Sequence, residues 1–293
     1  MKKRKLSVAI FFFILAIFIA YLILLAIVKY HKNEFQVPVL MYHDVVLDEY
    51  YNNKPDTISL TTFKKQLEYL KENYYHTLTL DEFYRWKEGK LIIPKKSVLL
   101  TFDDGFYSFH YLVEPLLNEY NMHAVCFIIG EFTGKTTPQY EPLRYGTIGI
   151  DQIYNHTANV EYGSHSFGLH KMIDNKKKVE VSTKEELNED LLKINNIYSF
   201  EYMSYPFNTD TDEEIKVLKK HGYKLAFRGE SEKATKNANN YQIPRIGIDN
   251  EIENFVKTLE TDYHNNRYGN GLLRKIMITI ERKIGKRIFK WYL

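Results

Sequence analysis

Short apolar runs alternate along this chain with segments in which apolar residues recur every three or four positions. The runs have the length of buried strands and lie at 37–42, 77–80, 98–102, 124–129, 160–163, 202–205, 224–227 and 243–248. Strands that alternate with helices pair mainly in parallel. The pattern therefore predicts an α/β fold. Residues 38–260, which no Pro-, Gly- or Ser-rich linker divides, have the size of a single α/β barrel.

Two predicted helices have a clear apolar face. That of the first helix, 61–72, consists of Phe63, Leu67 and Leu70. That of the second helix, which ends before Tyr198, consists of Leu187, Leu191, Leu192 and Ile194. A third helix is indicated at 107–120, and the highly charged stretch 174–186 is predicted to be a surface loop.

The beginning of the chain predicts a membrane anchor. Basic residues fill positions 2–5, and residues 6–28 contain no charged side chain. At ~1.5 Å per residue a helix of this length spans roughly 34 Å, enough to cross a hydrocarbon core of ~30 Å. The stretch lacks the small-residue cleavage site of a signal peptide. Because basic residues before the helix favour a cytoplasmic N-terminus, we expect segment 1–5 inside the cell, a single span, a linker at 29–37 and the domain outside.

Charge is distributed unevenly along the chain. The formal net charge is +3, but residues 1–5 contribute +4 and residues 272–293 contribute +6, which leaves about −7 for the rest. An acidic domain argues against nucleic acid as a partner. The tail at 261–293 combines basic residues with apolar residues at helical spacing. Two interpretations stay open: the tail binds an anionic membrane or wall polymer, or it packs on the domain with a solvated basic face.

The run at 98–102 ends in two adjacent carboxylates, Asp103 and Asp104, followed by Gly105. Enzymes with α/β folds place their chemistry at the carboxyl ends of such strands. Neighbouring side chains on a strand point to opposite faces, so both carboxylates serve one site only if the backbone turns, which Gly105 permits. The alternative is that one of the two caps the helix that follows.

Two histidines follow the run at 160–163. His165 and His170 are five residues apart, which is not the same-face spacing of a helix, so we expect them on a loop that Gly168 helps to bend. Two imidazoles and a carboxylate can bind a metal and leave a position open for water. A histidine pair by itself is more often unliganded in a chain with 10 histidines, but together with Asp103 and Asp104 it favours a metal site.

These residues resemble the signature of the polysaccharide deacetylase family, also called the NodB-homology domain or carbohydrate esterase family four. The similar segments are Thr101-Phe102-Asp103-Asp104-Gly105, His165-Ser166 with His170, Val39-Leu40-Met41-Tyr42-His43, Tyr205-Pro206-Phe207 and Pro244-Arg245-Ile246. The resemblance covers residues 38 to about 250 and implies a distorted, incomplete (β/α) barrel of mainly parallel strands. The five-residue step between the histidines is more similar to the branch that acts on poly-N-acetylglucosamine exopolysaccharide.

The resemblance also implies roles for individual residues. Asp104, His165 and His170 would hold a divalent metal, with Asp103 as the general base. The metal and the backbone N–H of Phe207 would hold the oxyanion, since Pro206 has no N–H to donate. For the metal, Zn²⁺ is expected, and the ligand set also admits Co²⁺, Ni²⁺ or Fe²⁺.

Two features depart from the family pattern. Tyr202 occupies the position of the arginine that orients the base, and Arg245 is the predicted substitute, with a surface arginine as the alternative. The Leu-x-His element that supplies the general acid is missing. His43 is the candidate acid, or else a substrate or structural contact.

The sequence thus predicts a membrane-anchored enzyme that hydrolyses N-acetyl groups on an extracellular polymer similar to poly-β-1,6-N-acetylglucosamine and releases acetate. Peptidoglycan is the alternative substrate. A catalytically weak glycan-binding matrix protein is the alternative from another class. The expected partners are the polysaccharide and the membrane, which the helix at 6–28 would cross and the tail at 261–293 is a second candidate to contact.

Overall fold

The computed structural model of the protein describes residues 13–15, 17–18, 21, 36–134 and 146–261. Its central strands are β2 (Val39–Tyr42), β6 (Ser97–Phe102), β7 (Ala124–Ile128), β8 (Val160–Ser164), β11 (Tyr202–Ser204), β12 (Leu225–Gly229) and β14 (Ile243–Gly247). They pair in parallel in the order β2, β14, β12, β11, β8, β7 and β6, and β6 pairs back with β2. The predicted parallel α/β barrel is therefore confirmed, with seven strands in the ring where a complete (β/α)₈ barrel has eight.

The strands are mainly apolar because both of their faces are covered. Every residue of β6 and β7 is buried. One face of each barrel strand points into the barrel and the other contacts the helices, so neither face selects polar side chains. An eighth strand, β5 (His76–Thr77), pairs with the first two residues of β6 outside the ring.

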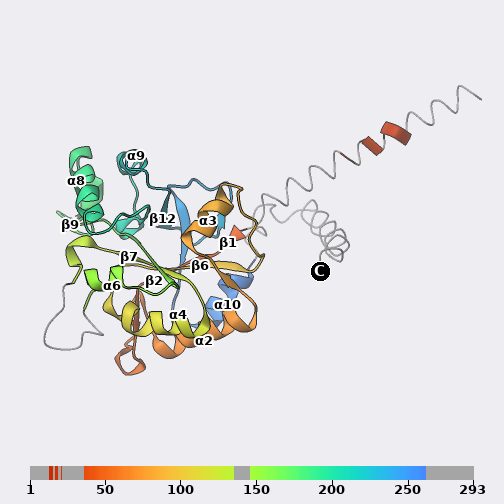
Figure 1. The fold of residues 1–293 in the computed structure, drawn as a ribbon, viewed down its shortest axis with the longest axis horizontal. Helices are drawn as coiled ribbons and strands as arrows, with labels where there is room; N and C mark the ends of the chain where they lie inside the picture. Colours follow the sequence, from red (N-terminus) through yellow and green to blue (C-terminus); the bar gives the residue numbers. More distant parts are fainter. Residues whose placement is uncertain (1–12, 16, 19–20, 22–35, 135–145, 262–293) are drawn as a thin grey trace, which may run out of the picture.

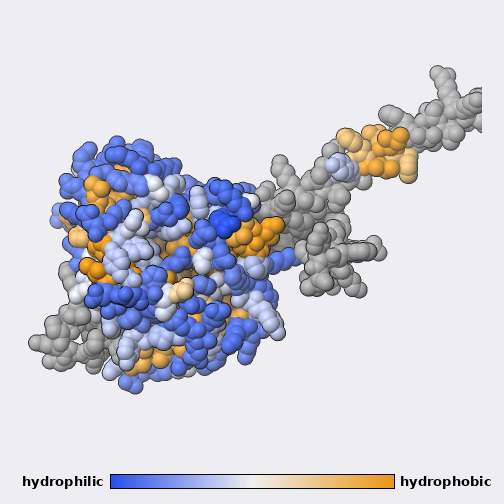
Figure 2. Space-filling view, viewed as in Figure 1, coloured by the Kyte–Doolittle hydropathy of each residue, from blue (hydrophilic) through white to orange (hydrophobic). Residues whose placement is uncertain are grey.

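Helices cover the outside of the barrel. The six longer ones are α2 (Leu60–Glu72), α3 (Leu80–Lys87), α4 (Glu114–Tyr120), α8 (Lys184–Asn195), α9 (Asp212–Lys220) and α10 (Ile252–Glu260). Helices α2, α4 and α10 pack together on one side, and α8 and α9 pack together on another (Figure 1). The face of the molecule seen in Figure 2 is mainly hydrophilic, with hydrophobic residues in small separate patches.

The structure also contains short helices, turns and two-stranded pairs. They are the helices α6 (Ile150–Tyr154) and α7 (Lys178–Val181), the 3₁₀ turns η1 (Asp48–Tyr50), η3 (Gly130–Phe132) and η4 (Pro206–Asn208), and the π-helical segment η2 (Phe109–Val113). Three two-stranded pairs are β1 (Gln36–Val37) with β13 (Ala234–Thr235), β3 (Asp44–Val46) with β4 (Thr57–Ser59), and β9 (Met172–Ile173) with β10 (Lys176–Lys177).

The prediction of a surface loop at 174–186 was wrong. Asp174 and Asn175 both have positive φ and form the turn of the β9–β10 hairpin, after which α7 begins at once. Helix α8 then starts with a capping box, in which Thr183 and Glu186 each accept a hydrogen bond from the backbone N–H of the other. The charged residues here are the solvated faces of regular elements.

Two smaller expectations also need correction. The strand predicted at 77–80 ends at Thr77, because Thr79 caps α3 with a second capping box. Leu192 is 47% exposed and does not belong to the buried face of α8. The helix predicted at 107–120 is present over that range, with the π-helical segment η2 between two α-helical parts.

Several predictions concern residues that the structure largely leaves undescribed. Within the segments predicted at 1–5, 6–28 and 29–37, the structure describes residues 13–15, 17–18, 21 and 36–37. Residues 13–15, 17–18 and 21 are helical. In the part of the chain that the structure describes, no helix has both the length and the apolar character needed to cross a bilayer. The predicted amphipathic tail lies outside the described residues except for Thr261. The anchor and the tail stay predictions.

Candidate active site

A cavity of about 660 Å³ lies at the carboxyl ends of the barrel strands. Residues that follow β2, β6, β8 and β11 meet there. The lining comprises Met41, His43, Asp44, Lys54, Pro55, Asp56, Thr57, Asp103, Asp104, Phe106, His165, His170, Lys177, Tyr205, Phe207 and Asn208. The structure therefore brings most of the predicted site residues to one cavity, at the end of the barrel where α/β enzymes place their chemistry.

The backbone turns at the two adjacent carboxylates, as the sequence required. Asp104 has φ 72° and Gly105 has φ 69°, so the left-handed turn begins at Asp104 itself. A Cβ on Gly105 would lie 3.1 Å from Ile128 Cγ2, which adds a packing reason for glycine. The helix-cap alternative for Asp103 or Asp104 was wrong, because neither residue is the N-cap of the helices that follow.

Asp104, His165 and His170 form a compact set of possible metal ligands. Asp104 Oδ1 is 3.5 Å from His165 Nε2 and 3.7 Å from His170 Nε2. All three ligand atoms lie within 4.8 Å of one another. Tetrahedral ligands at bonds of about 2.0–2.2 Å are roughly 3.3–3.6 Å apart, so these spacings suit one cation. Asp104 Oδ1 is buried and has no hydrogen-bond partner among the described residues, as expected of an atom reserved for a metal.

His165 is held in the orientation that a ligand needs. Its Nδ1 is 2.7 Å from the carbonyl oxygen of Ser204 and donates a hydrogen to it. This contact fixes the tautomer and leaves the Nε2 lone pair directed at the metal set. Burial, followed by the neighbouring His165, lowers the pKa of His170, which keeps that imidazole in the neutral form that binds metals.

The loop between the histidines bends at a different residue from the one expected. Ser166 has φ 68°, whereas Gly168 is not in the left-handed region. The His170 ring then packs against two others, with its centroid 4.9 Å from that of His165 and 4.2 Å from that of Phe207. Because the chain reverses at Ser166 and not at Gly168, His170 lies next to His165 although five positions separate them in the sequence.

Asp103 forms a bidentate ion pair with Arg245. Arg245 Nη1 donates to Asp103 Oδ1 at 2.8 Å and Nη2 donates to Asp103 Oδ2 at 2.6 Å. Arg245 is 0% exposed and Asp103 is 2% exposed, so the surface-arginine alternative was wrong. Burial alone would raise the pKa of Asp103, but the charges of Arg245 and then His165 outweigh it and hold the pKa well below its usual range. The carboxylate is therefore ionised, as a general base must be.

The remaining predicted residues, Phe207 and His43, both line the cavity. Phe207 has φ 54° inside η4, and its carbonyl oxygen accepts a hydrogen bond of 3.4 Å from Lys177 Nζ. His43 Nδ1 is 3.9 Å from Asp56 Oδ1. Their roles in oxyanion binding and proton donation stay predictions. Tyr202 lies on β11 without replacing the arginine, which comes from β14 instead.

Sequence reasoning missed several polar residues of the site. Ser204 Oγ donates to Asp103 Oδ2 and accepts from Arg245 Nη2, and Asn208 Oδ1 also accepts from Arg245. Asp44 lines the cavity and accepts a hydrogen bond of 2.6 Å from Ser108 Oγ. Burial raises the pKa of Asp44. In the sequence, these residues could have been found by their positions: Ser204 and Asn208 lie on either side of Pro206, and Asp44 follows His43.

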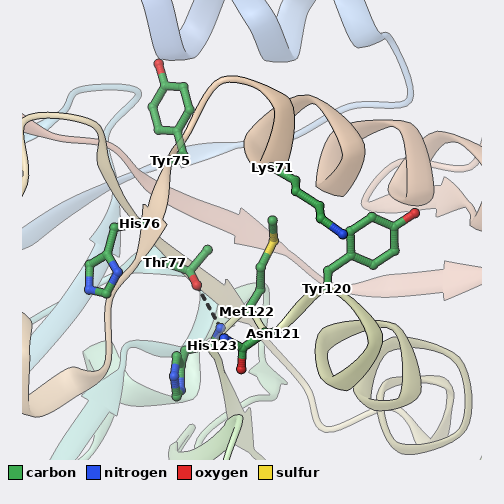
Figure 3. A pocket seen from close by; sticks show the side chains of 8 residues that line it. All are labelled: Lys71, Tyr75, His76, Thr77, Tyr120, Asn121, Met122 and His123. Carbon is green, nitrogen blue, oxygen red and sulfur yellow. Dashed lines mark hydrogen bonds between the residues drawn. The ribbon is translucent and has the colours of Figure 1, made fainter.

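A second cavity, of about 230 Å³, lies at the opposite end of the barrel. It is lined by Lys71, Tyr75, His76, Thr77, Tyr120, Asn121, Met122 and His123, which precede or begin β5 and β7 (Figure 3). The N–H of His123 donates to Thr77 Oγ1 at 2.8 Å, the bond drawn in Figure 3. The lining of this cavity, as far as the structure describes it, includes no carboxylate, so it does not repeat the aspartate and histidine set of the first cavity.

Comparison with known proteins agrees with this geometry. The sequence profile described as polysaccharide deacetylase matches residues 91–226. A poly-β-1,6-N-acetyl-D-glucosamine N-deacetylase of Staphylococcus epidermidis is 30% identical over 249 residues, which cover 78% of this chain and 84% of the relative. The chain belongs to the polysaccharide deacetylase family. A Staphylococcus aureus protein of the same name is 29% identical over 249 residues, covering 78% of this chain and 84% of the relative.

Solved structures share the polysaccharide deacetylase fold. The Streptococcus pyogenes deacetylase PplD, in complex with acetate, has a TM-score of 0.65 at 21% identity and covers 77% of this chain and 99% of its own. IcaB from Ammonifex degensii has a TM-score of 0.63 at 21% identity and covers 78% of this chain and 97% of its own.

Members of the polysaccharide deacetylase family are hydrolases of amide bonds that in general depend on a metal. The profile match contains Asp103, Asp104, His165 and His170 but neither His43 nor Arg245. The contact between Asp103 and Arg245 is therefore evidence that the structure supplies beyond the profile.

Proposed function

We propose that this polysaccharide deacetylase hydrolyses the N-acetyl groups of an extracellular poly-β-1,6-N-acetyl-D-glucosamine and releases acetate. The observation that carries the proposal is the pairing of an Arg245-bound Asp103 with the metal-ligand set of Asp104, His165 and His170 in one cavity. The names of the staphylococcal relatives support the choice of polymer.

Asp104, His165 and His170 would hold a divalent cation, for which we propose Zn²⁺. When bound, such a cation acidifies water and polarises a carbonyl oxygen. The neutral state of His170 and the fixed tautomer of His165 prepare both imidazoles for this role. Because Asp104 Oδ1 is buried without another partner, the cation would also satisfy an otherwise costly polar atom.

Asp103 would take a proton from the water whose oxygen attacks the acetyl carbon. Arg245 keeps the carboxylate ionised and fixes both of its oxygens, so the remaining lone pairs face a defined direction. The charge that develops on the acetyl oxygen would be stabilised by the N–H of Phe207. As the carbon–nitrogen bond breaks, the amine nitrogen takes up a proton, and His43 on the cavity wall is our proposed donor.

The cellular setting that we propose follows from the sequence. An uncharged stretch at 6–28 behind a basic segment would anchor the domain outside the cell membrane, where the polymer is found. Hydrolysis would convert neutral N-acetyl groups into cationic amines, which bind anionic surfaces.

Substitution of Asp103 tests the proposed reaction. The full-length Asp103→Asn protein should keep its bound metal but lose at least about 10²-fold in acetate release from β-1,6-linked N-acetylglucosamine oligomers, since an amide cannot act as the base. Metal content is measured by atomic spectroscopy and acetate by an enzyme-coupled assay. The control is Asp81→Asn, an exposed carboxylate on α3.

Four outcomes would contradict the proposal. Unchanged turnover of Asp103→Asn would show that Asp103 is not the general base. Activity that survives chelation of all metal would show that the reaction needs no metal. Faster acetate release from peptidoglycan than from the β-1,6-linked polymer would make peptidoglycan the substrate, and release from neither polymer would favour a glycan-binding protein.

A further inference from the structure

The loop that carries the two histidines is tied in its middle to helix α8. Asp190 Oδ2 accepts a hydrogen bond from the N–H of Phe167, and Asp190 Oδ1 accepts one from the N–H of Gly168, each at 2.7 Å. Asp190 is 7% exposed. One buried carboxylate thus binds two consecutive backbone N–H groups that lie between His165 and His170.

The rest of the loop is held from other directions. Its first half bonds to the segment that follows β7: the N–H of His165 donates to Ile128 O, and the N–H of Gly130 donates to Ser166 O. The N–H of Leu169 donates to Ser166 Oγ, within the loop itself. Among the described residues, Asp190 is the hydrogen-bond acceptor for the N–H groups of Phe167 and Gly168.

The position of His170 depends on this part of the loop. The ring of His165 is fixed separately, by its bond to Ser204 O. His170 comes after the turn at Ser166, so its distance from Asp104 Oδ1, 3.7 Å here, varies with the conformation of Phe167 and Gly168. A constraint on those two peptides is therefore a constraint on the third metal ligand.

A carboxylate suits this position better than its neutral isostere. Burial raises the pKa of Asp190, and its ionised form is supported against this by the N–H groups of Phe167 and Gly168 and then by Lys178, whose Nζ donates to Gly168 O at 3.0 Å. An asparagine offers a single acceptor oxygen, and its NH₂ group would face one of the two backbone N–H groups. Replacing Asp190 by asparagine thus breaks one bond and introduces a donor opposite a donor.

We propose that Asp190 is a positioning residue for the metal site: it fixes the backbone between His165 and His170 and thereby raises the affinity of the ligand set for its cation. The inference deepens the proposed function, because it assumes that Asp104, His165 and His170 bind a metal. It concerns binding and not turnover, so it is tested without the substrate.

The test measures the affinity of full-length, detergent-solubilised protein for Zn²⁺ and Co²⁺ after the metal has been stripped. Asp190→Asn should weaken binding by about tenfold or more, the range in which outer contacts of a metal site act. The absorption spectrum of bound Co²⁺ should also change, because the geometry around the ion depends on where His170 lies. Glu189→Gln, which makes the same change at an exposed neighbour on α8, should bind both metals as the parent does.

A second control separates positioning from general stability. Leu191→Ala removes a buried apolar side chain from the same helix but keeps Asp190 and its two hydrogen bonds to the loop, so it should lower Tm while metal affinity stays unchanged. If Asp190→Asn does not fold, Asp190→Glu, which keeps the charge but displaces the carboxylate, takes its place and should also bind metal more weakly. Parental affinity and Co²⁺ spectrum in the variant that folds would overturn the proposal. Absence of metal binding in the parent itself would instead refute the proposed function.

Discussion

Asp103 and Arg245 form an ion pair that is almost completely buried. Removing two charges from water is costly, and such a pair adds little net stability compared with apolar residues of the same size. Here the guanidinium is shared, since Arg245 Nη2 also donates to Ser204 Oγ and to Asn208 Oδ1. Because Asn208 adjoins Phe207, one arginine links the proposed base to the turn of the proposed oxyanion donor. We interpret the ion pair as a contact that orients the carboxylate of Asp103.

Substitution of Arg245 by lysine keeps the charge and removes the fork. A lysine cannot bind both oxygens of Asp103 as well as Ser204 and Asn208, so the base should lose its fixed direction. We expect Arg245→Lys to lower kcat for acetate release by about 10²-fold, the effect of a misplacement of about 1 Å. Arg245→Met should in addition raise the pKa of Asp103 and move the acidic limb of the kcat/KM profile to higher pH. Profiles in which Met and Lys variants coincide with the parent would contradict this role.

Glu214 is a second buried carboxyl group, and it has no such partner. It is 3% exposed, and neither carboxylate oxygen has a hydrogen-bond partner among the described residues. Burial, followed by the nearby charges of Asp190 and Asp210, raises the pKa of Glu214 well above its usual value. The folded protein therefore binds a proton that the unfolded chain releases.

This pKa predicts how stability depends on pH. Because the folded-state pKa is raised, the contribution of Glu214 is most favourable below the unfolded pKa of about 4.5 and is lost as pH rises through the folded pKa. Glu214→Gln removes the titration. The difference in unfolding free energy between variant and parent should therefore increasingly favour the variant between pH 5 and pH 8, with a slope of at most about 1.4 kcal/mol per pH step of one. Urea titrations at several pH values measure it, and a constant difference would show that Glu214 does not titrate on unfolding.

At the scale of elements, the strands of the barrel were the most predictable part. The eight predicted runs overlap the observed strands, because a strand covered on both faces is mainly apolar. The hairpin of β9 and β10 escaped prediction because each strand has only two residues: β9 is an exposed Met-Ile pair and β10 a pair of lysines, so neither gives the pattern of a buried strand. Its local signal was the Asp174-Asn175 turn, whereas the capping box that begins at Thr183 marks the start of α8.

Elements also decide which loops reach the site. The histidine loop begins directly after β8, so its place at the carboxyl end of the barrel could be expected from the sequence. Its attachment to α8 could not, because Asp190 reads as one of several acidic residues on an amphipathic helix. Only the packing of α8 beside the loop distinguishes this carboxylate from Glu189, which is exposed.

At the scale of the molecule, the barrel and its helices lie within residues 36–261. Near the end of this range, Lys233 Nζ donates to Leu259 O and Thr261 O, which ties the end of α10 to the domain. The contacts that build the site all join residues inside the same range. The described domain thus contains both the fold and the proposed chemistry.

A chain shortened to residues 36–261 should therefore fold and work without a membrane. We expect it to remain in solution without detergent, to unfold at the same temperature as the domain of the full-length protein, and to release acetate from soluble oligomers at the same rate per molecule. The full-length protein should instead sediment with membranes. Calorimetry, acetate assays and fractionation check these points. A shortened chain that aggregates or fails to bind metal would show that the flanking segments are part of the folded unit.

The sequence by itself determined the barrel strands and placed the predicted chemistry at their ends, because burial on two faces and adjacent ionisable residues leave strong local signals. The resemblance to the polysaccharide deacetylase family supplied the proposed ligand roles of Asp104, His165 and His170. Tertiary structure alone decided that Arg245 reaches Asp103, 142 positions away. The pairing of β14 with β2 and of β2 with β6 closes the ring and brings these two residues within hydrogen-bond distance. Nor could the sequence show that Ser166 bends the histidine loop or that Asp190 holds it. Such contacts depend on which distant elements become neighbours, and the residues themselves leave no periodic pattern.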